Sequence, residues 1–194
     1  MGEIEKIEAS MLAAELFKRN MRTSIVHLIT SLPRSKLRSI YKDIHKGSSP
    51  LSGLIISSGA LLNTRTDHLI SSVFSGTYFL LGGKDIFNNV NIEVLIKSYD
   101  FFKANELSFG RSSTMSKFDF TAAWVVARDI RSGVVTFEVC MHCDSAFISC
   151  EDSDLSRHCP CCNLIKKVNR DIYPTGTGKR LEHLSKNRAT HSFL

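Results

Sequence analysis

The chain has 194 residues, of which six are cysteine, and its formal net charge is +6 at pH 7. This length allows one compact domain with a hydrophobic core and a small appendage. So few cysteines exclude a disulfide scaffold. No apolar run approaches the roughly 20 residues that span a bilayer, which excludes a membrane-spanning protein.

Two segments carry most of the excess positive charge. Residues 21–47 hold six lysines and arginines against Asp43 alone, and residues 163–194 hold seven against two acidic residues. Two basic zones of this kind are typical of a surface that binds the phosphate backbone of nucleic acid. The alternative is an ordinary solvated surface followed by a basic tail. Because Glu3, Glu5 and Glu8 do not fit the basic start of a signal peptide, we expect a cytoplasmic location with free cysteines.

The first 47 residues predict a helical hairpin. Apolar residues in 4–30 recur at spacings of three and four, which indicates helix with a break near Asn20. A second helix begins around Pro33 and ends at Gly47. One of its faces is apolar (Leu37, Ile40, Tyr41 and Ile44), and its exposed sides are basic (Arg34, Lys36, Arg38 and Lys42). A helix, a short turn and a basic helix form the outline of a helix-turn-helix DNA reader, although amphipathic hairpins with solvated basic faces are common.

Further helices are predicted in the middle of the chain. After a serine-rich loop at 47–59, residues 60–81 indicate one long helix that ends at Gly82-Gly83. Its apolar stripe (Leu61, Leu62, Leu69, Ile70, Val73 and Phe74) is expected to be exposed and available to a partner's helices. Residues 92–103 and 117–131 indicate two more helices, separated by a loop at 105–116. The single tryptophan, Trp124, is interpreted as a core residue.

Four cysteines form two C-x-x-C pairs, which we call the first knuckle (Cys140 and Cys143) and the second knuckle (Cys159 and Cys162). Fifteen residues separate the pairs, a spacing at the short edge of the range for structural zinc sites. Strands are predicted at 134–139 and 146–150, on either side of the first knuckle. The sequence therefore predicts a zinc ribbon with one structural Zn²⁺ on four thiolates. Such a site leaves no open position for catalysis.

The sequence also contains other candidate ligands for the zinc ion. Cys161 competes with Cys159 or Cys162, and His142 or His158 is able to replace a sulfur. Two disulfides, or a redox-active pair, are less consistent with a cytoplasmic chain that lacks a βαβ pattern. The signatures of a zinc deaminase and of a phosphate-binding P-loop are absent, so we expect no enzymatic activity.

Three stretches resemble the FlhC family, a subunit of the bacterial flagellar master transcription activator. They are the basic helix and its loop (LPRSKLRSIYKDIHKGSSPLSG), the tryptophan-bearing helix with the first knuckle (FTAAWVVARDIRSGVVTFEVCMHC) and the second knuckle (AFISCEDSDLSRHCPCC). The resemblance covers about residues 10–170. It implies a mainly α protein with a zinc site at Cys140, Cys143, Cys159 and Cys162. It also implies DNA contacts by Arg34, Lys36, Arg38 and Lys42, and by Lys166, Lys167 and Arg170 after the second knuckle.

The same resemblance implies the partners. The family acts with a smaller helical subunit, FlhD, as four FlhD chains with two FlhC chains, binds double-stranded promoters of flagellar operons and recruits RNA polymerase at the nucleoid. We therefore expect a helical DNA- and partner-binding domain with a helix-turn-helix-like start (1–133), a zinc-ribbon module (134–170) and a flexible basic tail (171–194). The competing hypothesis is a zinc-ribbon adaptor that binds proteins and has no DNA contact of its own.

Overall fold

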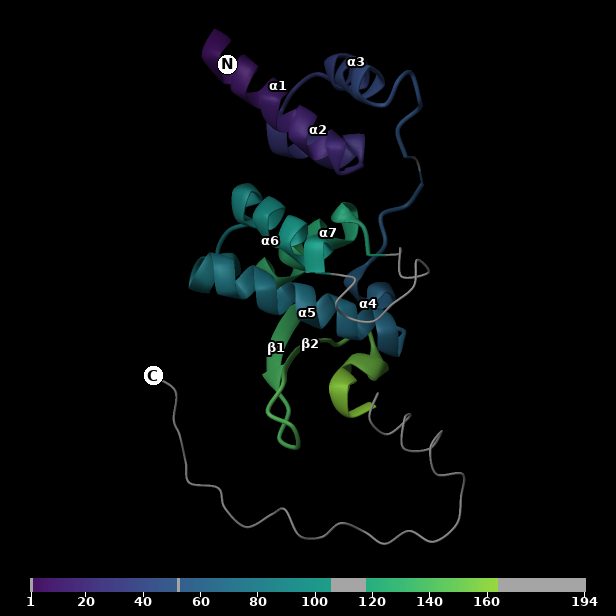
Figure 1. Cartoon of the computed structure of the whole chain (residues 1–194), viewed down its shortest axis with the longest axis vertical. Coiled ribbons are helices and arrows are strands. Elements are labelled where there is room, and N and C mark those ends of the chain that lie inside the picture. The colour runs from purple at the N-terminus through teal and green to yellow at the C-terminus, as the bar shows by residue number, and fades with distance from the viewer. Residues whose placement is uncertain (1, 52, 106–117, 164–194) are drawn as a thin grey trace, which may run out of the picture.

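The computed structural model describes residues 2–51, 53–105 and 118–163. Figure 1 shows three helices at one end of the long axis, further helices in the middle, and a hairpin with the knuckles at the other end. The mainly helical fold with a small sheet confirms the predicted fold class. Three predicted DNA contacts (Lys166, Lys167 and Arg170), the predicted tail and nearly all of the predicted 105–116 loop lie outside the described residues.

The first three helices form what we call the N-terminal unit: α1 (Glu3–Lys18), α2 (Thr23–Thr30) and α3 (Arg34–Ile44). Asn20 and Ser31 have left-handed backbone conformations, with φ of 58° and 56°, and end the first two helices. The predicted break near Asn20 is thus confirmed. Leu37 and Tyr41 of α3 are buried, so α3 packs with the face that the sequence predicts.

The prediction of one continuous helix at 60–81 is wrong. Two helices occupy this region, α4 (Ser58–Leu61) and α5 (Arg65–Gly82), with a turn between them. The Thr64 side chain accepts a hydrogen bond from the backbone N–H of Asp67 at 3.0 Å and starts α5 anew. An N-terminal cap of this kind satisfies a first-turn donor, so the chain starts a new helix here.

The prediction that this segment exposes its apolar stripe is also wrong. Leu61, Leu62, Ile70 and Phe74 are at most 4% exposed and belong to the protein's own core. Exposed apolar side chains on α5 lie instead at its C-terminal end, where Leu80 is 82% exposed. Gly83, with φ of 59°, caps α5 where the sequence predicts its end, and a short 3₁₀ helix, η1 (Gly83–Phe87), follows.

Helix α7 (Phe120–Arg131) is buried on almost every side and forms the centre of the core together with α5 and α6 (Ile92–Asn105). The Asp119 side chain caps its start by accepting from Ala122 N–H at 2.7 Å. Trp124 is 6% exposed, which confirms its interpretation as a core residue. A helix that is buried on almost every side requires cover from several elements, and this makes α7 the element around which the others pack.

The sheet consists of β1 (Val135–Val139) and β2 (Ala146–Cys150), paired antiparallel with Phe137 opposite Ile148. The outer edge of β2 docks on α5. Ile148 N–H donates to Ser72 Oγ at 3.3 Å, and Ile148 O lies 2.7 Å from His68 Nε2. Because Val135, Ile148 and Cys150 share the core cluster of the helices, the hydrophobic core is continuous across residue 134. The division into domains at that residue stays a prediction.

No described helix is both long enough and apolar enough to cross a membrane.

Candidate metal centre

The β1–β2 hairpin positions the first knuckle. Cys140 follows β1 directly, and its N–H donates to the carbonyl of Ser145 at 3.0 Å. Asp144 N–H donates to the carbonyl of Cys140 at 2.9 Å, and Asp144 has a φ of 56°, so the chain turns back on itself within this loop. This tight turn places the thiols of Cys140 and Cys143 on one side of the hairpin tip.

A helical turn positions the second knuckle. Residues 160–163 are helical, and Pro160 occupies the first helical position, where its missing N–H costs nothing. Cys159 and Cys162 are three residues apart across this turn, a spacing that brings side chains to the same side. The preceding 3₁₀ helix, η3 (Asp154–Arg157), is tied back to β2, because Cys150 N–H donates to Ser156 Oγ at 2.9 Å.

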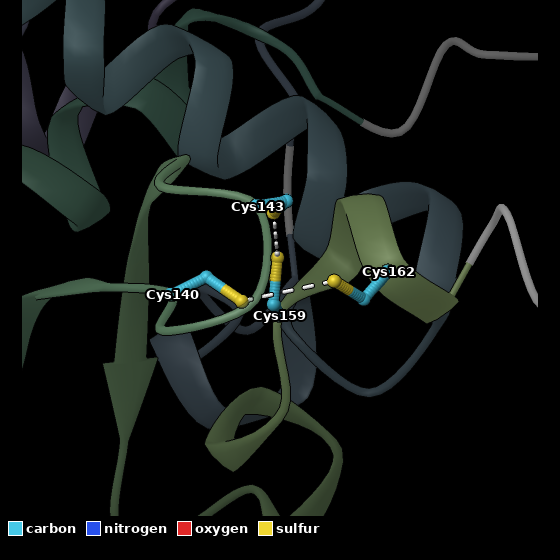
Figure 2. Close-up of side chains that lie close together, drawn as sticks. All are labelled: Cys140, Cys143, Cys159 and Cys162. Atoms are coloured by element: carbon cyan, nitrogen blue, oxygen red, sulfur yellow. Dashed lines mark hydrogen bonds between the residues drawn. The ribbon is translucent and has the colours of Figure 1, made fainter. Parts of the chain in front are cut away.

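The two knuckles bring four sulfur atoms together (Figure 2). Cys140 Sγ lies 3.7 Å from Cys162 Sγ, Cys143 Sγ lies 3.6 Å from Cys159 Sγ, and all four lie within 4.8 Å of one another. Zn–S bonds of about 2.3 Å place the sulfurs of a tetrahedron about 3.8 Å apart. The four cysteines are therefore positioned to hold a metal ion, and the donor set fits zinc.

The electrostatics of the cluster also favour a cation. Hydrogen bonds with Ser145 lower the pKa of the Cys143 thiol to about 6, whereas burial raises the pKa of Cys159 to about 12. The pKa of Cys162 is raised to about 11, first by its hydrogen bond with Cys143. Four adjacent sulfurs cannot all be ionised at neutral pH on their own, because like charges oppose one another. A bound divalent cation removes this obstacle.

The other candidate ligands lie outside the four-sulfur cluster. His142 and His158 are exposed, and neither they nor Cys161 belong to the group that could hold an ion. Cys150 is 3% exposed and packs in the main core, not in the smaller cluster where Phe147 covers Cys140 and Cys159.

The predicted DNA-binding residues of α3 are exposed but do not share one side of the helix. Arg34, Arg38 and Lys42 follow one another at intervals of four residues, whereas Lys36 lines a groove against α1 with Ile7 and Met11. The pocket that contains Arg34 and Arg38 also contains Arg22. Sequence reasoning did not assign Arg22 a site, although it belongs to the same basic segment, because only folding places it opposite α3.

Comparison with known proteins gives matches over most of the chain. A family model described as flagellar transcriptional activator (FlhC) matches residues 2–172. The flagellar transcriptional regulator FlhC of Proteus mirabilis is 29% identical over 83% of this chain and 80% of its own length. For Nitrosomonas eutropha FlhC the identity is 27%, with 82% and 81% covered, and for Paraburkholderia atlantica FlhC it is 29%, with 71% and 61% covered.

Proposed function

The chain belongs to the FlhC family of flagellar transcriptional activators, and from this premise we propose that it is a DNA-binding activator subunit. In this proposal it joins an FlhD-type partner, as four partner chains with two of this chain, binds promoters of flagellar operons at the bacterial nucleoid and recruits RNA polymerase. No catalytic step is part of the proposal.

The observation that carries the proposal is the basic side of α3. Arg34, Arg38 and Lys42 are exposed, and α3 is separated from α2 by three residues, as in a helix-turn-helix unit. Lysine and arginine on such a helix displace counterions from phosphates and provide salt-sensitive affinity for duplex DNA. Sequence preference would come from side chains at the base edges or from DNA deformation.

In the proposal one Zn²⁺ is held by Cys140, Cys143, Cys159 and Cys162 and acts as a structural clamp. Four thiolates occupy every position of a tetrahedral ion, which leaves none for water or substrate. The ion would fix the hairpin tip against the second knuckle, where only Phe147 and the cysteines form a small cluster of their own.

In the proposal, the partner subunit binds to an exposed apolar surface on α1. Ile4, Ile7 and Met11 are 74%, 55% and 67% exposed, and they lie opposite the residues that α1 buries in the core. Ile7 and Met11 line an apolar groove with Leu32, Pro33 and Ile40 of the neighbouring segments. An exposed apolar stripe beside a groove suits the apolar face of a partner helix.

The test is a binding titration with the assembled complex. This chain and the FlhD-type partner from the same source are co-expressed, and the complex is titrated onto a flagellar promoter duplex and onto a scrambled duplex at physiological salt. We expect tight binding to the promoter, weaker binding to the scrambled duplex and one zinc per chain. A stable complex that binds neither duplex would contradict the DNA-binding proposal.

A second candidate, a protein-binding adaptor, is favoured by the apolar surface near the hairpin. Phe79, Phe87 and Phe137 form a ring cluster with centroids 5.7–6.0 Å apart, and the first two are 38% and 42% exposed. Half-exposed aromatic clusters are typical of protein interfaces. The adaptor predicts normal partner binding after Arg34, Lys36 and Arg38 are neutralised, with no salt-dependent affinity for DNA.

A further inference from the structure

One pocket between the N-terminal unit and the loop residues Pro50, Leu51 and Gly53 contains three arginines, and no acidic residue of the described chain lines it. It has a volume of about 350 Å³, and its basic walls are Arg22, Arg34 and Arg38. We propose that this pocket binds one phosphate group of the DNA backbone and so fixes the register of the protein on the duplex. The inference rests on the proposed DNA-binding function and assigns it a specific anion site.

The positions of Arg34 and Arg38 destabilise α3 electrostatically, and a bound anion would offset this destabilisation. Arg34 and Arg38 are one turn apart and both exposed, and neither is ion-paired within the described part of the chain. Like charges four residues apart destabilise a helix, and a cation in the first turn opposes the helix dipole. A phosphate between the two guanidinium groups would turn both unfavourable contacts into favourable ones.

The start of α2 adds to the positive potential of the pocket. Thr23 and Ser24, the first two residues of α2, line the pocket, and no acidic residue lies in the first turn of α2 or of α3. No side chain caps either helix start by a hydrogen bond. The first N–H groups of a helix carry partial positive charge and are well suited to phosphate oxygens.

The Arg22 side chain is fixed on the wall of the pocket in the absence of a ligand. Its Nη1 donates to the carbonyl of Gly53 at 2.6 Å, which ties the residue to the loop that closes the pocket. Gly53 has a φ of +105°, a conformation that glycine adopts without strain. A guanidinium fixed in this way loses less side-chain freedom on binding than a mobile one, which favours affinity.

The experiment measures which DNA phosphates the pocket contacts. The complex with the FlhD-type partner is titrated onto a set of promoter duplexes, each with one neutral methylphosphonate in place of a phosphate. The variant is Arg34→Gln/Arg38→Gln. The control is Lys36→Gln, which removes one positive charge from the same helix but outside the pocket. Circular dichroism checks that each variant keeps its helices.

We expect at least one position at which a methylphosphonate weakens DNA binding by the wild type and by the Lys36→Gln control but not by the double variant. The double variant should bind promoter and scrambled duplexes about tenfold more weakly, by the same factor for both. Its slope of log affinity against log salt should fall by about 1 for the lost phosphate contact.

Three outcomes would overturn the inference. Suppose that each methylphosphonate that weakens DNA binding by the wild type weakens binding by the double variant to the same degree. The pocket then does not contact DNA, although the proposed function stands. If calorimetry shows inorganic phosphate binding to the wild type and not to the double variant while the DNA scan is unchanged, the occupant is free phosphate. If the wild-type complex binds no duplex at all, the proposed function fails and the DNA assignment with it.

Discussion

Cys159 and Cys161 are two residues apart in the second knuckle but have different surroundings. Cys159 is buried and its Sγ lies 3.6 Å from Cys143 Sγ, whereas Cys161 is half-buried and lies outside the four-sulfur cluster. On a helical turn, side chains three apart share a side and those one apart do not. Cys162 therefore lies in the cluster with Cys159, whereas Cys161 packs beside the cluster and its sulfur is not one of the four.

We predict that Cys159→Ser loses the metal and that Cys161→Ser keeps it. A structural zinc on thiolates contributes on the order of 10 kcal/mol to the fold of a small module, and a hydroxyl is a poor substitute for a thiolate ligand. Zinc content by atomic absorption should be close to zero in the first variant and unchanged in the second. Equal zinc content in the two variants would contradict the assignment of Cys159.

His68 is the buried titratable residue at the junction of α5 and β2. Its side chain is fully buried, and Nε2 lies 2.7 Å from the carbonyl of Ile148. Burial lowers its pKa, and the hydrogen bond with Ile148 opposes this only in part. The ring is therefore neutral in the folded protein at pH values where an exposed histidine begins to be protonated.

We predict an acid-dependent loss of stability that depends on His68. Because its folded pKa lies below the value of about 6.5 in the unfolded chain, the unfolded state binds the proton first. The stabilisation is complete above about pH 6.5 and is lost as the pH falls below it. His68→Gln, which keeps an N–H donor, should reduce the slope of the free energy of unfolding against pH by up to about 1.4 kcal/mol per pH unit. Urea unfolding at pH 7.5 and 5.5 measures the difference, and identical slopes would contradict the role of His68.

At the scale of elements, α5 contacts α6, α7 and β2, and its glycines have different surroundings. Gly76 lies in the helix interior, and a Cβ there would meet no atom within 4 Å. Gly82 lies at the end of α5, and a Cβ there would be 2.5 Å from Ile86 Cγ2 and 3.0 Å from Val94 Cγ1. Gly82 thus permits the close approach of η1 and α6.

We predict opposite effects for alanine at the two positions. Gly76→Ala should stabilise the protein by about 0.5–1 kcal/mol, because alanine has less backbone freedom to lose in a helix. Gly82→Ala should destabilise it by about 1–3 kcal/mol, because two β-branched side chains must move. Thermal unfolding of both variants checks the signs. A stabilising Gly82→Ala would contradict the close approach of Ile86 and Val94 to this glycine.

At the scale of the whole molecule, an ion pair joins the N-terminal unit to the central helices. Arg19, just after α1, donates from Nε and Nη2 to the two carboxylate oxygens of Asp100 on α6, at 2.9 and 2.6 Å. Its guanidinium also lies 6.0 Å from the centroid of the Phe120 ring. Two parallel hydrogen bonds fix the relative orientation of both groups and so of both helices.

We predict that Asp100→Asn destabilises the protein by about 1 kcal/mol, at the upper end of the range for exposed pairs, because its contact with Arg19 is bidentate. The matched control is Glu93→Gln on the same helix, whose contact with Lys97 is 4.0 Å long and exposed on both sides. That variant should change the free energy of unfolding by less than about 0.5 kcal/mol. Urea denaturation compares the two, and equal effects would show that the Arg19 contact has no special strength.

The long axis of the molecule also bears on any DNA footprint. In Figure 1 the basic helix α3 lies at one end, and the knuckles, where the described chain ends at Asn163, lie at the other. A footprint that includes both α3 and the surface near the knuckles would therefore extend along the molecule or require bent DNA, and bending has a sequence-dependent energy that contributes to specificity.

Much of the fold and of the site follows from the sequence alone. The break at Asn20, the core face of α3, the end of α5 at Gly83 and both strands depend on local signals: left-handed residues, helical periodicity and alternation. The family resemblance, confirmed by the match over residues 2–172, depends on motifs that are likewise local. Even the missed break between α4 and α5 had such a signal, since Thr64-x-x-Asp67 is a helix-start pattern.

Only the tertiary structure decided the rest, because it depends on which segments meet in space. Burial of the 60–81 stripe follows from the packing of α5 against α6, α7 and β2, which no pattern within α5 reveals. The same holds for Cys161, which the sequence leaves open as a competing ligand but whose sulfur lies outside the group of four. Arg22 joins Arg34 and Arg38 in one pocket only because α2 and α3 fold against each other. Periodicity determines which face of an element is apolar, but the tertiary contacts determine what covers that face.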